Sequence, residues 1–445
     1  MLALSSVSVG ASVLAVAVFV ITIAIEPAIG LVAVAIAIPF GNLVRIPLGG
    51  ANLVDVLVGV TAAAWIARGV AQRRLVFRAP PLTSVVLILT WTLALSLTQA
   101  QSFSLGAGEW LKWLEFALVY LLATQLLAPH KVAWVIGALF ASAMAEVALG
   151  AYQYLNSAGP EAFLVGEHLR AYGTLNQPNP YAGYLGCLTP VAVSLALAAL
   201  GRWWTARKRI DLALGTMCAV IGLAMIAGIA MSSSRGSWLG LAAGLLVVVC
   251  MRSRRTAIVS SAVIVLLVVF LAAAGTAWLP HPLASRVSDL AGYITGPDPA
   301  RTEITDANFA ILERLAHWES GLRMFDAHPL LGVGIGNYEA AYGSFALPHW
   351  YDSLGHAHNI FINFLAESGF VGLAAFLLFW CGALVVAWRG AQRSSGYSAA
   401  VALGVVGTIA YITVHSLFDN LFVQHIQLQL ALMLGGVASA ELASE

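Results

Sequence analysis

Long apolar segments alternate with short polar breaks along almost the whole chain. A membrane-spanning helix needs about 20 apolar residues, and thirteen segments approach or exceed that length. They lie at 5–25, 28–44, 52–67, 82–99, 109–128, 131–155, 179–200, 211–230, 236–250, 256–279, 358–388, 398–418 and 421–440. Two of them are short, and only Glu26-Pro27 separates the first pair. The pattern predicts an all-α polytopic membrane protein with twelve or thirteen transmembrane helices.

One long polar segment interrupts this pattern and divides the chain into three parts. An N-terminal transmembrane bundle is expected over 1–279, a large and partly helical extracytoplasmic loop over 280–357, and the last transmembrane helices over 358–445. Only 10% of the residues are charged, against about 25% in a typical soluble domain. The net charge of +1 gives no general attraction to nucleic acid.

The placement of basic residues orients the spans. Clusters at 68–78, 131, 202–209, 252–255 and 389–393 occupy alternate loops, and loops rich in Lys and Arg stay in the cytoplasm. The loop at 280–357 is then outside and the C-terminus inside. The N-terminus is inside with twelve spans and outside with thirteen.

The outer loop is predicted to contain a helix that ends before His328-Pro329, with Asp306 as its cap. Arg314 and Trp318 would share one face because they are four residues apart. The expected apolar stripe consists of Leu312, Leu315, Leu322 and Phe325. The glycines of 332–336 follow no strand and lack a Gly-Lys-Ser/Thr sequence, so they predict a tight turn and not a nucleotide loop.

Two histidines, His356 and His358, lie where the outer loop re-enters the membrane. A neutral imidazole can act as a general base near pH 7. Their alternate spacing places them on opposite sides of an extended chain, so one of them should face a site, and His358 begins the next helix. A metal site using both with Asp352 or Glu367 is an alternative without a recognised ligand spacing. A histidine that caps the helix is another.

Two arginines are candidates for binding an anion. Arg235 follows three serines in a tight turn between two apolar segments, where hydroxyls, turn N–H groups and a guanidinium fork can surround phosphate oxygens. The alternative is an arginine that extends to the lipid headgroups. Arg314 either contributes to the same site or lies on a solvated helix face, paired with Glu313 or Glu319.

Further polar residues lie in the last spans. Glu367 is nine residues into the span that begins at His358, while His415 and Asp419 end the next one at its outer face. An ionisable group in a span is costly and often functional. These residues either orient a histidine, pair with an arginine or join neighbouring helices.

These residues form an ordered set of short motifs over roughly 170–420. In chain order the set is Ser234-Arg235-Gly236, Arg314 with Trp318, His328-Pro329-Leu330-Leu331-Gly332-Val333-Gly334, His358-Asn359 and Glu367-Ser368-Gly369. The set resembles the O-antigen ligase / O-antigen polymerase superfamily. The resemblance implies a C-type membrane glycosyltransferase of about twelve spans, which takes a glycan from undecaprenyl diphosphate and needs no metal or nucleotide cofactor.

The resemblance also implies roles for individual residues. Arg235 and Arg314 would hold the diphosphate, with Ser234 in support. His358 would be the catalytic histidine, with His356 as the second choice, and Glu367, His415 and Asp419 would support them. The active site would face the periplasm from the bacterial inner membrane.

Three transferase activities fit this reading, and a transporter is an alternative from a different class. A ligase of lipopolysaccharide biosynthesis would use lipid A core as the acceptor, a polymerase would use another lipid-linked repeat unit, and an oligosaccharyltransferase would use a protein. A transporter of lipid-linked oligosaccharides would bind its cargo with the same arginines but would need no base. The candidate charges gather at the outer face and not at the membrane midplane, which favours an enzyme.

Overall fold

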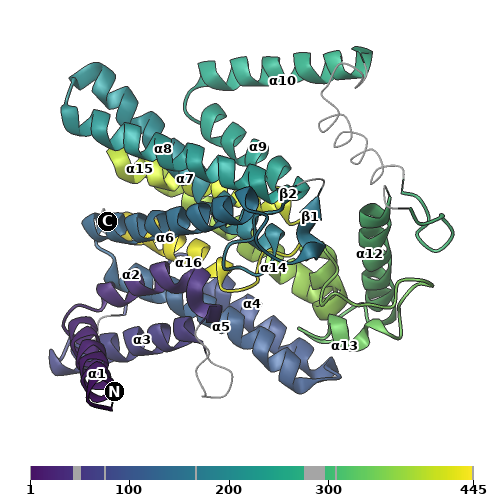
Figure 1. Ribbon diagram of the computed structural model, residues 1–445, viewed down its shortest axis with the longest axis horizontal. Helices are drawn as coiled ribbons and strands as arrows, with labels where there is room; N and C mark the ends of the chain where they lie inside the picture. Colours follow the sequence, from purple (N-terminus) through teal and green to yellow (C-terminus); the bar gives the residue numbers. More distant parts are fainter. Residues whose placement is uncertain are drawn as a thin grey trace.

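The computed structural model describes residues 2–43, 52–74, 77–165, 168–274, 296–305 and 308–442. Nearly all of the regular structure in these ranges is helical (Figure 1). The one sheet within them is a short antiparallel hairpin of β1 (Leu164–Val165) and β2 (His168–Leu169). The prediction of an all-α protein is confirmed for the part of the chain that is described.

Each of the thirteen predicted apolar segments corresponds to a helix. They are α1 (Leu2–Ile25), α2 (Ala28–Ala37, continued by the 3-10 turn η1, Ile38–Leu43), α3 (Leu53–Ala71), α4 (Thr83–Ser96), α5 (Phe103–Leu126), α6 (Pro129–Leu155), α7 (Pro178–Ala206), α8 (Arg209–Ser232), α9 (Arg235–Cys250), α10 (Arg254–Ala274), α14 (Ile360–Arg393), α15 (Gly396–His415) and α16 (Ile426–Leu442). Two further short 3-10 turns are η2 (Leu97–Gln99) and η3 (Glu161–Phe163). Six described helices, α3, α6, α7, α8, α14 and α15, are long and apolar enough to cross a membrane. The total of twelve or thirteen spans stays a prediction.

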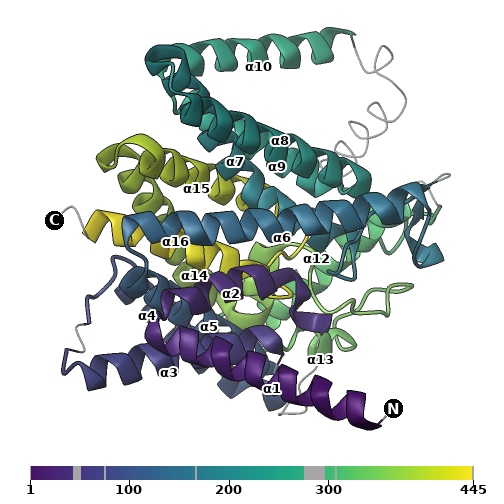
Figure 2. The ribbon, with the colours of Figure 1, turned by 60° about the vertical axis from the view of Figure 1, so that its left-hand side comes forward.

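Helices α7, α8, α9 and α15 pack together in the bundle, while α10 lies apart from it and contacts α9 (Figures 1 and 2). Glycines permit the close approach of α7, α9 and α15. A Cβ atom on Gly186 would lie 1.9 Å from the ring of Tyr411, and one on Gly244 would lie 2.7 Å from the carbonyl oxygen of Gly407. Small residues serve this purpose between membrane helices because they let the backbones meet.

Two of the basic loops meet at one end of the bundle. Arg202, near the end of α7, lies 3.8 Å from Asp211 and 5.2 Å from the ring centroid of Tyr397 at the start of α15.

The helices of the polar segment, α12 (Phe309–Ala327) and α13 (Tyr338–Tyr342), lie beside the beginning of α14 (Figure 1).

Helix α12 confirms the predicted helix that ends before His328. Its proposed cap, Asp306, lies outside the described residues. The predicted apolar stripe is wrong at Leu322, which is 39% exposed. The buried face instead contains Ala316, Ser320 and Gly321 with larger neighbours. Small side chains bring α12 close to α14, since a Cβ atom on Gly321 would lie 2.8 Å from Ile362.

Helix α14 is interrupted at Gly369, where the backbone turns to a φ of 64°. The segment after α12 docks at this break. The amide of Phe370 donates to the carbonyl of Pro329 at 2.8 Å, and the amide of Val333 donates to Ala366 at 2.9 Å. Gly332, Gly334 and Gly336 all have positive φ, which favours glycine. The predicted tight turn is therefore confirmed.

Candidate functional site

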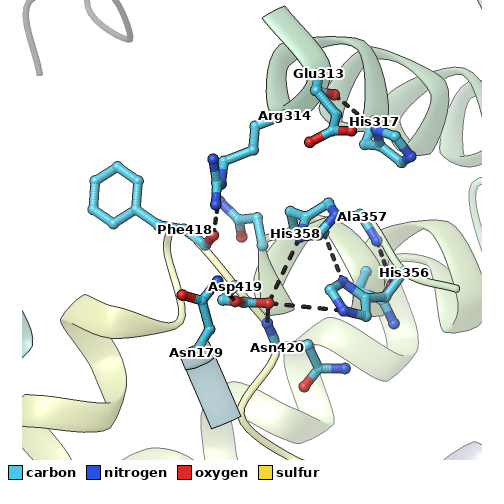
Figure 3. Close-up of polar contacts among 12 residues, drawn as sticks. Asn179, Glu313, Arg314, His317, His356, Ala357, His358, Phe418, Asp419 and Asn420 are labelled. Atoms are coloured by element: carbon cyan, nitrogen blue, oxygen red, sulfur yellow. Dashed lines mark hydrogen bonds and ion pairs between the residues drawn. The ribbon is translucent and has the colours of Figure 1, made fainter. Parts of the chain in front are cut away.

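Asp419 lies in the turn between α15 and α16. Its carboxylate is the centre of a polar cluster. Its Oδ1 is 3.6 Å from His358 Nδ1 and 3.7 Å from His356 Nε2. Its Oδ2 accepts a hydrogen bond of 2.6 Å from the amide of Asn179 at the start of α7. Figure 3 shows both imidazoles directed at this carboxylate. The histidine pair and the acid therefore form one unit, although more than 60 positions separate them in the sequence.

The prediction that the two histidines point to opposite sides of the chain is wrong. The chain is not extended there: His358 has a φ of 52°, and its amide donates to His356 Nδ1 at 3.1 Å. A left-handed conformation costs an ordinary residue roughly 1–2 kcal/mol. Neighbouring contacts hold it, because Asn359 caps α14 and Asn363 accepts a bond from the Ala357 amide.

The hydrogen bonds of His356 define its tautomer. Because Nδ1 accepts the amide of His358, a neutral ring carries its proton on Nε2, the atom that faces Asp419. The ligand atoms of His356, His358 and Asp419 lie within 4.8 Å of one another. However, a metal ligand must offer a lone pair, and His356 Nε2 has none in this tautomer. The two acids predicted for a metal site make other contacts: the Asp352 carboxylate accepts the amide of Leu354, and the Glu367 carboxylate accepts the amide of Tyr338. The geometry therefore favours proton transfer over metal ligation.

Burial and charge act in opposite directions on this cluster. Burial would raise the pKa of Asp419, but close contact with His358 and the charges of His358, His356 and Arg314 hold that pKa well below its usual range. Burial and repulsion from His358 lower the pKa of His356 to about 3. At neutral pH the cluster therefore contains a carboxylate beside a neutral His356.

His358 is the one member of the pair with a spare nitrogen. Neither of its buried ring nitrogens has a hydrogen-bond partner among the described residues. Nδ1 faces Asp419, and a proton there leaves a lone pair on Nε2. The ring of His317, on α12, lies 5.3 Å away and nearly perpendicular. His358 therefore has the arrangement expected of a general base oriented by a carboxylate.

Arg314 lies beside this carboxylate, on the face of α12 that the sequence predicted. Its Nε donates to the carbonyl of Phe418 at 3.1 Å (Figure 3). Trp318, one turn later, directs its indole N–H at the carbonyl of His358 at 3.4 Å. Glu319 instead pairs with Arg323 at 3.0 Å. Arg314 thus belongs to the cluster and not to a solvated face of the helix.

Arg235 is the first residue of α9, where the backbone N–H groups and the helix dipole favour an anion. Ser233 before it is left-handed, and Ser234 is buried. A Cβ atom on Gly236 would lie 3.3 Å from Cβ of Phe418, so the start of α9 packs against the residue to which Arg314 donates. Arg314 and the start of α9, which carries Arg235, therefore both contact Phe418.

A comparison with protein families decides the relationship. A family model described as O-antigen ligase matches residues 220–377. The match supports a relationship to the O-antigen ligase superfamily. The chain is a multi-pass membrane protein, and the match supports a membrane glycosyltransferase of the O-antigen ligase or polymerase type. No curated protein matches the chain.

The O-antigen ligase domain contains four of the residues predicted for catalysis and diphosphate binding, and the rest of the cluster comes from outside it. Arg235, Arg314, His356 and His358 lie within the matched segment. Asp419 and Asn179 come from the chain after and before it. The site is thus assembled by the whole bundle.

Two other predicted residues, Glu367 and His415, make their printed hydrogen bonds outside the histidine pair. Glu367 accepts the backbone amide of Tyr338 at 3.0 Å and so holds the turn that follows α12. His415 Nδ1 lies 2.9 Å from the hydroxyl of Tyr411, which in turn contacts Ser237 of α9 at 2.7 Å. Within the described residues, neither side chain hydrogen-bonds to His356 or His358.

Sequence reasoning missed the contribution of Asn179 and gave no role to Arg170. Arg170 lies in the segment before α7, and Asn179 lies in the first turn of α7, between Pro178 and Pro180. Prolines favour the first turn of a helix, so a polar residue between them faces the helix end. That signal, together with an arginine nine residues earlier, indicates a polar helix start but does not identify its partner.

Proposed function

We propose that the protein transfers a glycan from undecaprenyl diphosphate to a hydroxyl of lipid A core, at the outer face of the bacterial inner membrane. The observation that carries this proposal is the geometry of His358. One ring nitrogen faces the Asp419 carboxylate at 3.6 Å, and the other has no partner among the described residues.

His358 would act as the general base. With its proton on Nδ1, its Nε2 lone pair takes the proton of the acceptor hydroxyl as the hydroxyl oxygen attacks the anomeric carbon. Asp419 stabilises the imidazolium that forms and keeps the ring in the required tautomer, as carboxylates do in catalytic triads. A general base contributes roughly 10²–10⁴ in rate.

The leaving group would depart toward the arginines. As the new bond forms, the bond from the anomeric carbon to the phosphate oxygen breaks, and undecaprenyl diphosphate keeps the electron pair. Arg235, Arg314 and the N-terminus of α9 balance the developing negative charge. Each charged hydrogen bond is worth about 1.5–3 kcal/mol. Direct displacement inverts the anomeric centre, and the proton on His358 is later released to solvent.

The sidedness of the site follows from the distribution of basic residues. The loops with Arg202 and Arg393 are adjacent, because α7 and α8 meet the α14–α15 loop through Arg202, Asp211 and Tyr397. Loops of this kind stay in the cytoplasm. The histidine cluster lies beyond the other ends of α8 and α15 and so, on this proposal, faces the periplasm.

A reconstituted transfer assay tests the proposal. Purified protein in detergent would receive an undecaprenyl-diphosphate glycan, with lipid A core in one tube and donor alone in another, in the presence of EDTA and without nucleotide. We expect core-linked product that is lost in His358→Gln. A ladder of longer lipid-linked chains would instead indicate a polymerase. Donor binding that depends on Arg235, without any product, would indicate a transporter and contradict the proposal.

A further inference from the structure

The Asp419 carboxylate is the end of a chain of hydrogen bonds that begins at Arg170. Arg170 donates through one terminal nitrogen to Asn179 Oδ1 at 3.0 Å, and Asn179 Nδ2 donates to Asp419 Oδ2 at 2.6 Å. The three residues come from the segment before α7, the first turn of α7 and the turn before α16. The chain therefore joins parts of the molecule that are far apart in sequence.

This arrangement is directional. A guanidinium can only donate, so the amide oxygen of Asn179 must face Arg170 and its NH₂ group must face Asp419. Asp419 Oδ2 is thus fixed by Asn179, while Oδ1 accepts the Asn420 amide at 2.8 Å and faces both imidazoles. Fixing one oxygen of a carboxylate fixes the direction of the other. Arg170 and Asn179 therefore determine where Oδ1 points.

The same guanidinium also contacts the turn that presents Arg235. Arg170 Nε donates to the carbonyl of Ser232 at 2.7 Å. Ser232 is the last residue of α8 and lies three positions before Arg235. One side chain thus contacts both the turn that presents Arg235 and the amide that orients Asp419.

We infer that Arg170 and Asn179 are positioning residues, which hold the base-supporting carboxylate and the diphosphate-binding turn in a fixed relation. The inference rests on the proposed function. Asn179 acts only through Asp419 and so on the proton-transfer step. Arg170 acts on both Asn179 and the turn that presents Arg235, and so also on the binding of the lipid-diphosphate donor.

A double-mutant cycle tests the role of Asn179. In the wild-type background, Asn179→Ala should lower kcat by about 10- to 100-fold, the usual range for a residue that orients a catalytic group, with the donor KM within threefold. In an Asp419→Asn background the same substitution should change kcat less than twofold, because the group it orients has already lost its role. Gln177→Ala is the control: its side chain is exposed and does not cap α7, and it should leave kcat unchanged.

Arg170→Lys tests whether Arg170 affects donor binding as well as the proton-transfer step. Lysine keeps the positive charge but cannot hold two acceptors with a planar fork. We expect it to lower kcat and also to raise the donor KM by more than threefold. Should Asn179→Ala not yield folded protein by size-exclusion chromatography, Asn179→Ser, which keeps a hydroxyl donor, carries the same cycle.

Losses that multiply in the Asn179–Asp419 double variant would overturn the inference, as would an unchanged kcat in Asn179→Ala. Those results leave the proposed function standing as long as wild-type transfer occurs and depends on His358. If transfer is absent, or His358→Gln is fully active, the proposed function fails and this inference fails with it.

Discussion

His358 Nδ1 lies 3.6 Å from Asp419 Oδ1, in a chain segment whose left-handed backbone turns the imidazole toward that carboxylate. The contact favours the tautomer of His358 with its proton on Nδ1 and a lone pair on Nε2. In the proposed mechanism, the negative charge of Asp419 would also stabilise the protonated ring that general-base catalysis creates. Both effects depend on the carboxylate and not on the size of the side chain.

Replacement of Asp419 by asparagine should therefore lower kcat while the protein still folds. We expect a loss on the order of 10²–10⁴, with the donor KM changed only a few-fold, because the proposed diphosphate contacts come from Arg235 and Arg314 and not from Asp419. Asp352→Asn is the matched control, since the Asp352 side chain is exposed and its one printed partner within the described ranges is the nearby Leu354 amide. Near-normal turnover by Asp419→Asn would show that His358 is not oriented by this acid.

Two arginines on α12 allow a direct test of diphosphate binding. Arg314→Gln should lower kcat/KM for the lipid-linked donor by roughly tenfold to more than a hundredfold, since a charged hydrogen bond is worth about 1.5–3 kcal/mol. Arg323→Gln should have little effect, because Arg323 forms an exposed i,i+4 pair with Glu319. Equal losses in the two variants would indicate a general electrostatic effect of the helix.

The break in α14 and the turn after α12 pack so closely that neither Gly332 nor Gly369 should accept a side chain. A Cβ atom on Gly332 would lie 2.4 Å from the carbonyl carbon of Glu367, and one on Gly369 would lie 2.3 Å from Leu330. Both glycines also have positive φ. Gly332→Ala and Gly369→Ala should each destabilise the fold by about 3 kcal/mol or more, which thermal unfolding in detergent would detect. Gly343→Ala meets nothing within 4 Å and should unfold like the wild type.

The buried histidines predict loss of stability in acid. His356 has a pKa lowered from 6.5 to about 3, mainly by burial, and burial also lowers the pKa of His317. Between these limits the unfolded chain binds protons that the folded chain does not, so the free energy of unfolding falls as the pH drops from about 6.5 to 3. One such group contributes up to about 1.4 kcal/mol per pH unit. Asp419 stays ionised throughout this window, because its pKa is held below its usual range.

Thermal unfolding at pH 7.5 and pH 5 measures this effect. The change in midpoint from pH 7.5 to pH 5 should be less favourable to the folded state in the wild type than in His356→Gln, which has no proton to gain. His130→Gln is a comparison outside the cluster, since His130 lies in the first turn of α6. A difference that is the same in wild type and His356→Gln would contradict the assignment of His356 as neutral.

Hydrophobic patterning predicted the helices well, because each apolar segment has to satisfy its own backbone hydrogen bonds in a membrane. The site was predicted only in part. Arg314 and Trp318 were placed on one face by helical spacing, which is a local property. His356 and His358 were misjudged because their arrangement depends on a left-handed residue, held by Asn359 and Trp318. No local sequence pattern predicts such a turn.

The partner of the histidine pair shows a second limit of sequence reasoning. Asp419 was a candidate, yet its link to Asn179 joins positions 240 residues apart. Such a contact depends on how α7 packs against α15, which is decided by glycines meeting Tyr411 and by similar close approaches. Glu367 shows a different case: of the roles predicted for this buried acid, the structure fits the joining of neighbouring helices, because Glu367 of α14 accepts the backbone amide at the start of α13.

The most direct test compares the two histidines in single-turnover transfer at saturating donor and acceptor. His358→Gln should lower the rate by roughly 10²–10⁴. His356→Gln should keep most of it, because the His356 lone pair is already used by the His358 amide. Near-full turnover by His358→Gln, together with loss of activity in His356→Gln, would contradict the assignment of His358 as the base.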